Sequence, residues 1–115
     1  MSSTTSQAAT LFKVMQILTE EIDRDLPITS ALVFVRVAKA GSEGIDQGQV
    51  QDDLKLSSST MSRTAQTLGE THYGKDKPGL GLVVRTMDVR DNHKRIMQLT
   101  PKGERLMVKV NAALR

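Results

Sequence analysis

Two short helical segments that meet at residues 55–57 constrain the fold of this chain more than any other feature of its sequence. The first should begin at Asp46, because Asp46 and Gln49 have the spacing of a capping box. The second should begin at Ser57, because serine is a preferred cap of helix N-termini. Helical spacing predicts the inward side chains Val50, Leu54, Met61, Ala65 and Leu68. Two short helices joined in this way indicate a helix-turn-helix.

The outer face of the second segment carries hydroxyl and amide side chains together with one arginine. Ser and Thr bind either kind of base edge, Gln pairs with adenine, and Arg binds guanine or phosphate. Such a face suits a helix that enters the DNA major groove, although a capped surface helix with solvated serines is the alternative. The residues expected on this face are Ser58, Ser59, Ser62, Arg63 and Gln66.

A basic hairpin is expected after this unit. A loop over residues 71–81 leads to two β-rich runs, 82–89 and 94–99, which are separated by the charged residues 90–93. The tip of such a hairpin can place an arginine in the minor groove, while the residues nearer the core contact phosphates. The alternative is a solvated turn with surface ion pairs. The basic residues expected at DNA are Lys75, Lys77, Arg85, Arg90, Lys94 and Arg95.

Three further helices surround these elements. One should begin at Thr29, end at Gly41 and lie at the centre of the core, because it is apolar on nearly all sides. The helix over residues 7–24 carries an apolar stripe of Leu11, Met15, Leu18 and Ile22. The last helix should begin at Thr100 and Pro101, and it aligns Met107, Val110 and Leu114. The stripe of the first helix must be buried on this domain or on a partner chain.

The charge of the chain is unevenly distributed. Residues 1–71 hold 6 Lys and Arg against 9 Asp and Glu, a net charge of −3. Residues 72–115 hold 10 against 4, a net charge of +6. This asymmetry favours a molecule with one side that faces a polyanion.

Several functions are excluded or disfavoured by what the chain does not contain. The absence of cysteine excludes disulfides and thiolate zinc sites, and an aromatic content of 3% argues against modules that stack bases. His72 and His93 lack a third metal ligand at suitable spacing, and the sequence shows no nucleophile with a base. We therefore expect no metal, no cofactor and no enzyme activity. The chain has neither a signal peptide nor an apolar run of the roughly 18 residues that cross a membrane, so we expect a cytoplasmic protein.

The order of these elements resembles the MarR-type winged-helix transcription regulators over about residues 26–110. The resemblance is carried by QGQVQDDLKLS at 47–57, STMSR at 59–63, DVRD at 88–91 and LTPKG at 99–103. The last two motifs are the more specific. The resemblance implies an α+β fold, namely a mainly helical winged helix-turn-helix with a two- to three-stranded β wing.

The same resemblance implies a homodimer whose recognition helices enter successive major grooves, where Thr60 would join Ser58, Ser59, Ser62 and Arg63 in facing bases and phosphates. It also implies that Arg90 lies at the tip of a wing that reaches the minor groove. Residues 26–100 would form the DNA-binding domain, and the helices within 1–25 and 101–115 would form the dimer interface. The interface residues would be Leu11, Met15, Leu18, Ile22, Met107, Val110 and Leu114. Family members often bind phenolic effectors, but the few aromatic side chains of this chain do not favour one.

The function implied is that of a sequence-specific regulator of transcription that binds double-stranded DNA and represses by occupying its operator. Two alternatives remain open. A winged helix can also serve as a protein-interaction module or accessory factor. It can also act as a DNA-binding protein in plasmid or phage replication or partition.

Overall fold

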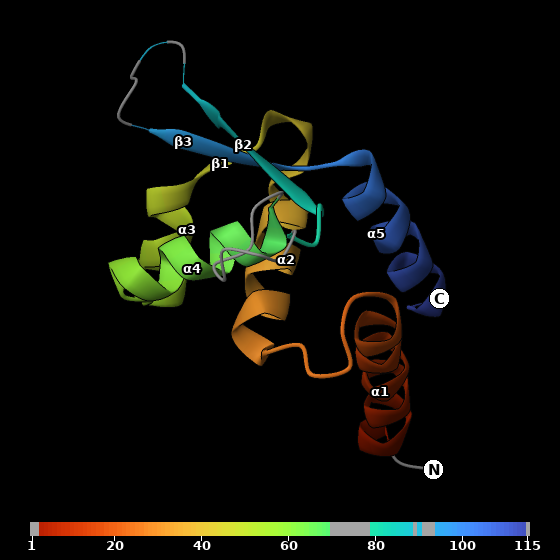
Figure 1. Cartoon of the computed structure of the whole chain (residues 1–115). Coiled ribbons are helices and arrows are strands. Elements are labelled where there is room, and N and C mark those ends of the chain that lie inside the picture. Colours follow the sequence, from red (N-terminus) through yellow and green to blue (C-terminus); the bar gives the residue numbers. More distant parts are fainter. Residues whose placement is uncertain (1–2, 70–78, 89, 91–93, 115) are drawn as a thin grey trace.

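The computed structural model describes residues 3–69, 79–88, 90 and 94–114. In this part of the chain, one small antiparallel sheet lies along an edge of a group of helices, so the predicted α+β class is confirmed (Figure 1). The elements in chain order are α1 (Ser3–Glu21), α2 (Ile28–Ala40), the short 3-10 helix η1 (Gly41–Glu43), β1 (Ile45–Asp46), α3 (Gln47–Leu54), α4 (Ser58–Leu68), β2 (Val83–Met87), β3 (Arg95–Leu99) and α5 (Pro101–Ala113).

The sheet has the strand order β1-β3-β2, with both pairs antiparallel. Val83 lies opposite Leu99 and Met87 lies opposite Arg95, so β2 and β3 form the predicted hairpin. The short strand β1 adds the third strand, with Ile45 opposite Met97. The hairpin projects beyond the helices, as a wing does (Figure 1).

The core lies between α2, the helix-turn-helix and the inner face of the sheet. Its largest fully buried side chains include Phe34 from α2, Met61 and Leu68 from α4, and Met97 from β3. Val50 and Ala65 are buried as predicted, and Leu54 is half-buried against the same cluster. The aliphatic and methionine side chains therefore fill the core almost without aromatic residues.

Helix α2 differs from its prediction at its start and on its outer face. It begins at Ile28 rather than after Thr29, because the carbonyl of Pro27 accepts the backbone N–H groups of Ser30 and Ala31. The outer face is not buried, since Leu32 is 49% exposed. The predicted end is confirmed, because Gly41 follows the helix with φ +77°, a conformation that favours glycine.

Of the four predicted helix caps, at Thr29, Asp46, Ser57 and Thr100, two form. Ser57 Oγ accepts the backbone N–H of Thr60, and Thr100 Oγ1 accepts the backbone N–H of Gly103. The Asp46 capping box was wrong, because the Asp46 side chain accepts no capping hydrogen bond in the described structure. Asp46 is also the last residue of β1, opposite Ile96, so the sheet fixes its position.

Helices α1 and α5 pack against each other, away from α3 and α4 (Figure 1). Helix α1 ends at Glu21 rather than at residue 24, because Asp23 Oδ1 accepts the backbone N–H of Asp25 and forms a turn. An ion pair of 2.8 Å joins Lys109 Nζ of α5 to Glu21 Oε1. Among the described residues, no helix is both long and apolar enough to cross a membrane.

The start of α5 is held by contacts with the segment before β2. Thr100 Oγ1 donates to the carbonyl of Gly81 at 2.6 Å, and Lys102 Nζ donates to the carbonyl of Leu80 at 2.8 Å. Gly103 is buried so close to this backbone that a Cβ atom there would overlap the carbonyl oxygen of Leu82. These contacts give the LTPKG motif a structural role.

Candidate nucleic-acid interface

The turn between α3 and α4 sets the direction of the predicted recognition helix. Lys55 adopts the left-handed conformation with φ 56°, which lets its backbone N–H bind the carbonyl of Asp52. The backbone N–H of Leu56 then binds the carbonyl of Gln51 at 3.0 Å. Ser57 caps α4 immediately afterwards, so one short turn ends α3 and starts α4.

Helix α4 divides into a buried face and an accessible face. Met61, Thr64, Ala65 and Leu68 are buried in the core. Of the six predicted DNA-facing residues, Ser58, Ser59 and Arg63 are exposed, whereas Thr60, Ser62 and Gln66 are partly exposed. The structure thus leaves the predicted recognition face available to a ligand.

Hydrogen bonds join three hydroxyl groups at the start of α4. Ser57 Oγ donates to Thr60 Oγ1 at 2.9 Å and lies 3.3 Å from Ser59 Oγ. Thr60 Oγ1 also accepts from Arg63 Nη2 at 3.5 Å. The sequence predicted Ser57 only as a backbone cap, so its link to two candidate base-contacting side chains was missed.

The wing presents basic side chains in different environments. Arg85 in β2 is half-buried, and its Nη1 donates to Gln47 Oε1 at the start of α3 at 3.3 Å. Arg90 and Lys94 are exposed near the hairpin tip. Asp88 Oδ1 accepts the backbone N–H of Arg90 at 2.9 Å, so Asp88 holds the backbone at this arginine. Predicted Arg95 is exposed in β3.

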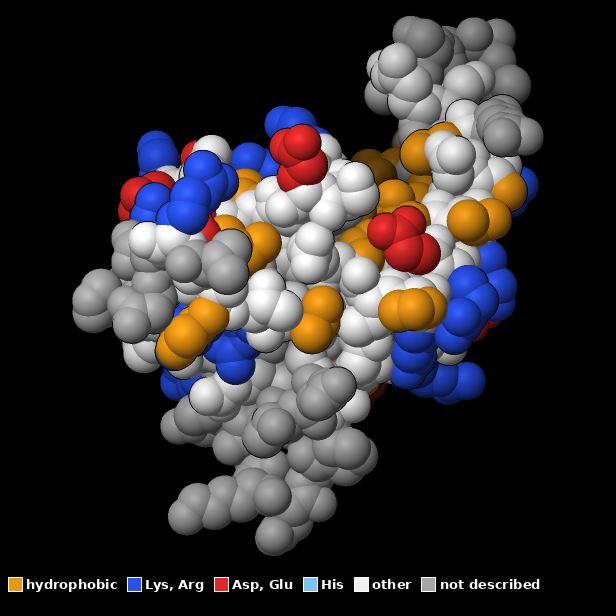
Figure 2. Space-filling view, turned by 90° about the horizontal axis from the view of Figure 1, so that it is seen from above, with side chains coloured by type: hydrophobic (Ala, Val, Ile, Leu, Met, Phe, Trp, Pro, Cys, Tyr) orange, Lys and Arg blue, Asp and Glu red, His pale blue; other side chains and the backbone are white. Residues whose placement is uncertain are grey.

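Two predicted phosphate contacts, Lys75 and Lys77, lie outside the described residues. Seen from above, the Lys and Arg side chains of the described residues gather in separate groups on opposite sides of the molecule (Figure 2). Among the described residues of the C-terminal half, the Lys and Arg side chains belong to the wing and to α5.

An ion pair that the sequence analysis missed ties α3 to α2. Arg36 Nε and Nη2 both donate to Asp53 Oδ2, at 3.2 and 3.0 Å. Asp53 lies in α3, directly before the turn to α4. The two residues are 17 positions apart and on separate helices, so helical spacing gives no signal for this contact.

The predicted dimer residues divide into three groups. Leu18 and Val110 are buried in the core of their own chain, and Ile22 and Met107 pack partly against it. Leu11, Met15 and Leu114 are exposed by 59%, 43% and 57%. Phe12, which the sequence analysis did not select, is 66% exposed on the same helix.

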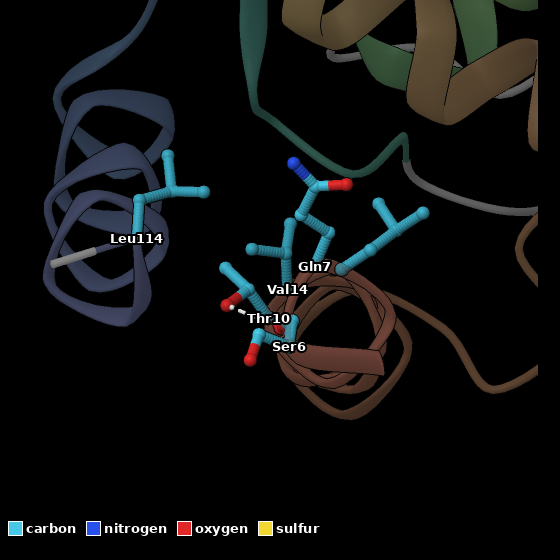
Figure 3. Close-up of a pocket in the computed structure, with 6 residues that line it drawn as sticks. Ser6, Gln7, Thr10, Val14 and Leu114 are labelled. Carbon is cyan, nitrogen blue, oxygen red and sulfur yellow. Dashed lines mark hydrogen bonds between the residues drawn. The ribbon is translucent and has the colours of Figure 1, made fainter. Parts of the chain in front are cut away.

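An open cavity of about 390 Å³ lies between the N-terminal half of α1 and the end of α5. Val14 and Leu114 approach it from opposite helices, with Gln7 and Thr10 along the α1 side (Figure 3). Thr10 Oγ1 donates to the carbonyl of Ser6, which leaves mostly apolar groups in this space.

The described residues contain no group of three or more His, Asp or Glu side chains placed to hold a metal ion. His72 and His93 lie outside this part of the chain. The accessible polar groups of α4 and the wing are suited to hydrogen bonding and charge pairing instead.

No protein-family model and no curated protein matches the chain, but solved structures do. The PcaV transcriptional regulator from Streptomyces coelicolor matches 95% of this chain with a TM-score of 0.62 and 19% identity, over 66% of its own length. A MarR-family transcriptional regulator from Rhodococcus sp. RHA1 matches 96% of this chain with a TM-score of 0.64 and 25% identity, over 69% of its length.

AbfR, solved bound to DNA, matches 96% of this chain with a TM-score of 0.62 and 19% identity, over 73% of its length. The chain thus spans about two thirds to three quarters of these regulators. It has the winged helix-turn-helix fold of MarR-family regulators, and the fold implied by the sequence resemblance is confirmed.

Proposed function

We propose that this chain is a transcription regulator that binds specific sequences of double-stranded DNA and represses by occupying its operator. The observation that carries the proposal is the accessible polar face of α4 beside a basic wing. Ser58, Ser59 and Arg63 are exposed on that face, and Arg90 and Lys94 are exposed on the wing. The fold shared with AbfR, which was solved bound to DNA, supports the same function.

A homodimer is the second part of this proposal. Leu11, Phe12 and Met15 expose apolar surface on α1, and Leu114 does so at the end of α5. Apolar residues grouped on adjacent helices favour contact with another protein surface. Two copies joined through α1 and α5 would each present one α4 to DNA. We place such a regulator in the cytoplasm.

Mobility shift with duplexes selected from a random library tests the proposal. We expect one duplex class to bind far more tightly than bulk DNA, with an affinity that falls linearly with salt on logarithmic scales. R90Q and R63Q should each weaken binding. R63Q should also change the preferred bases in the major groove, whereas R90Q should change the preference only at the flanking base pairs that the wing reaches through the minor groove.

The matched control is K39Q, which removes an exposed positive charge at the end of α2 that is not among the predicted DNA contacts. It should leave the affinity and the preferred sequence nearly unchanged. Failure of the unaltered protein to prefer any duplex, or an affinity that does not respond to salt, would refute the proposed function.

A further inference from the structure

The three hydroxyl groups at the start of α4 are bonded in an order that restricts what each can offer to DNA. A hydroxyl group has one proton to donate and two lone pairs that accept. Ser and Thr are therefore usually able to bind either kind of base edge. Ser57, Ser59 and Thr60 lose that freedom because they bond to one another.

Ser57 uses all of its hydrogen-bonding capacity inside the protein. Its single proton goes to Thr60 Oγ1 at 2.9 Å. Its lone pairs accept the backbone N–H of Thr60 at 3.1 Å and face Ser59 Oγ at 3.3 Å. Because Ser57 has no second proton, Ser59 must be the donor in the contact between them.

The two neighbouring hydroxyls are left with opposite characters. Ser59 donates its only hydroxyl proton to Ser57, so toward any other partner Ser59 can only accept a hydrogen bond. Thr60 Oγ1 accepts from Ser57 and from Arg63 Nη2, so its lone pairs are used. Among the described residues, no hydrogen bond takes the proton of Thr60, which remains available.

We propose that Ser57 fixes this polarity, so that Ser59 meets DNA as an acceptor and Thr60 meets it as a donor. The inference rests on the proposed function and deepens it, because it assigns specificity to two named side chains. Ser59 would then favour the amino groups of adenine or cytosine in the major groove. Thr60 would favour the acceptor edges of guanine or thymine.

Base preferences measured on a randomised duplex library test this assignment. S59A should reduce discrimination at one base pair by about three- to tenfold, the value of one hydrogen bond. T60V should reduce base discrimination at two neighbouring base pairs. The variant loses the Thr60 hydroxyl, and because Ser57 then has no Thr60 Oγ1 to donate to, it can donate to Ser59, which is no longer restricted to accepting from DNA. T60S keeps the hydroxyl and should retain both preferences.

S57D provides the sharper test. Its carboxylate still caps the helix but can only accept hydrogen bonds, so it draws the proton of Thr60 inward. Discrimination should therefore fall at the base pair that T60V affects and S59A does not. Repulsion between the added charge and DNA lowers affinity for all sequences alike, so it cancels in a ratio of affinities.

The outcomes separate the two proposals. A wild-type protein without any sequence preference would refute both. The polarity assignment alone is overturned if wild type has a preference but T60V changes one base pair only, or lowers affinity equally on every sequence. An unchanged Thr60 preference in S57D would also overturn it.

Discussion

The helix-turn-helix unit and the pair of terminal helices are stabilised in different ways. Helices α2, α3 and α4 enclose a core in which Val33, Phe34 and Met61 are completely buried. Helix α1 contributes Leu18 to that core but leaves Phe12 and Leu11 mostly in solvent. The comparison shows that the helix-turn-helix unit has a fully buried core within one chain, whereas α1 leaves large apolar side chains exposed.

The largest expected effect concerns the central core. F34A should lower the free energy of unfolding by about 3–5 kcal/mol, because it leaves a cavity at a fully buried position. Denaturant unfolding measures this loss. V35A, at the 42% exposed neighbour on the same helix, is the control and should cost much less. Equal losses would contradict the division of α2 into two faces.

The next effect concerns the outer surface of α1. F12S should weaken self-association by roughly 30-fold or more, because a buried aromatic anchor at an interface contributes about 2 kcal/mol. Sedimentation equilibrium measures the dimer constant. I28S removes a side chain of similar exposure, 70% against 66%, from α2 and should leave association unchanged. If both variants associate like wild type, α1 is not the dimer surface.

The third effect concerns the contact between α5 and the segment before β2. G103A should destabilise the fold by about 1–3 kcal/mol, since its Cβ would push against the backbone of Leu82. G48A in α3 is the matched control, where only the Asp46 side chain lies near and alanine favours the helix. Thermal unfolding should show Tm changes of opposite sign for the two variants. An unchanged Tm for G103A would show that the backbone at Leu82 can move away from the added Cβ at little cost in stability.

The smallest effect concerns the link between α1 and α5. Lys109 and Glu21 are paired at 2.8 Å, but their side chains are 57% and 45% exposed. K109M should therefore cost less than about 1 kcal/mol, and the difference from wild type should shrink in high salt. A double-mutant cycle with E21Q isolates the pair. A coupling that salt does not reduce would mean that this pair is shielded from solvent.

Local sequence rules predicted the parts of the structure that depend on neighbouring residues. The caps at Ser57 and Thr100, the end of α2 at Gly41 and the hairpin all follow from residues a few positions apart. The Asp46 cap failed because pairing with Ile96 in another strand determines the position of that residue.

The candidate site was only partly predictable for a related reason. Spacing identified the accessible face of α4, but the bonds from Arg36 to Asp53 and from Arg85 to Gln47 join distant segments. The stripe on α1 shows the same limit. Leu11 and Leu18 look equivalent in sequence, yet only Leu18 reaches the core, because burial depends on where α5 and the core lie.

The short segment at residues 80–82 is hydrogen-bonded to both α4 and α5. Its backbone N–H groups bind the carbonyls of Thr67, Leu68 and Gly69 at the end of α4. Its carbonyls accept bonds from Thr100 and Lys102 at the start of α5. In a dimer that forms through α5, these hydrogen bonds would hold α4 at a fixed position relative to α5. The packing at the dimer interface would then set the distance between the two α4 helices. It would thereby help to match them to half-sites about 34–36 Å apart.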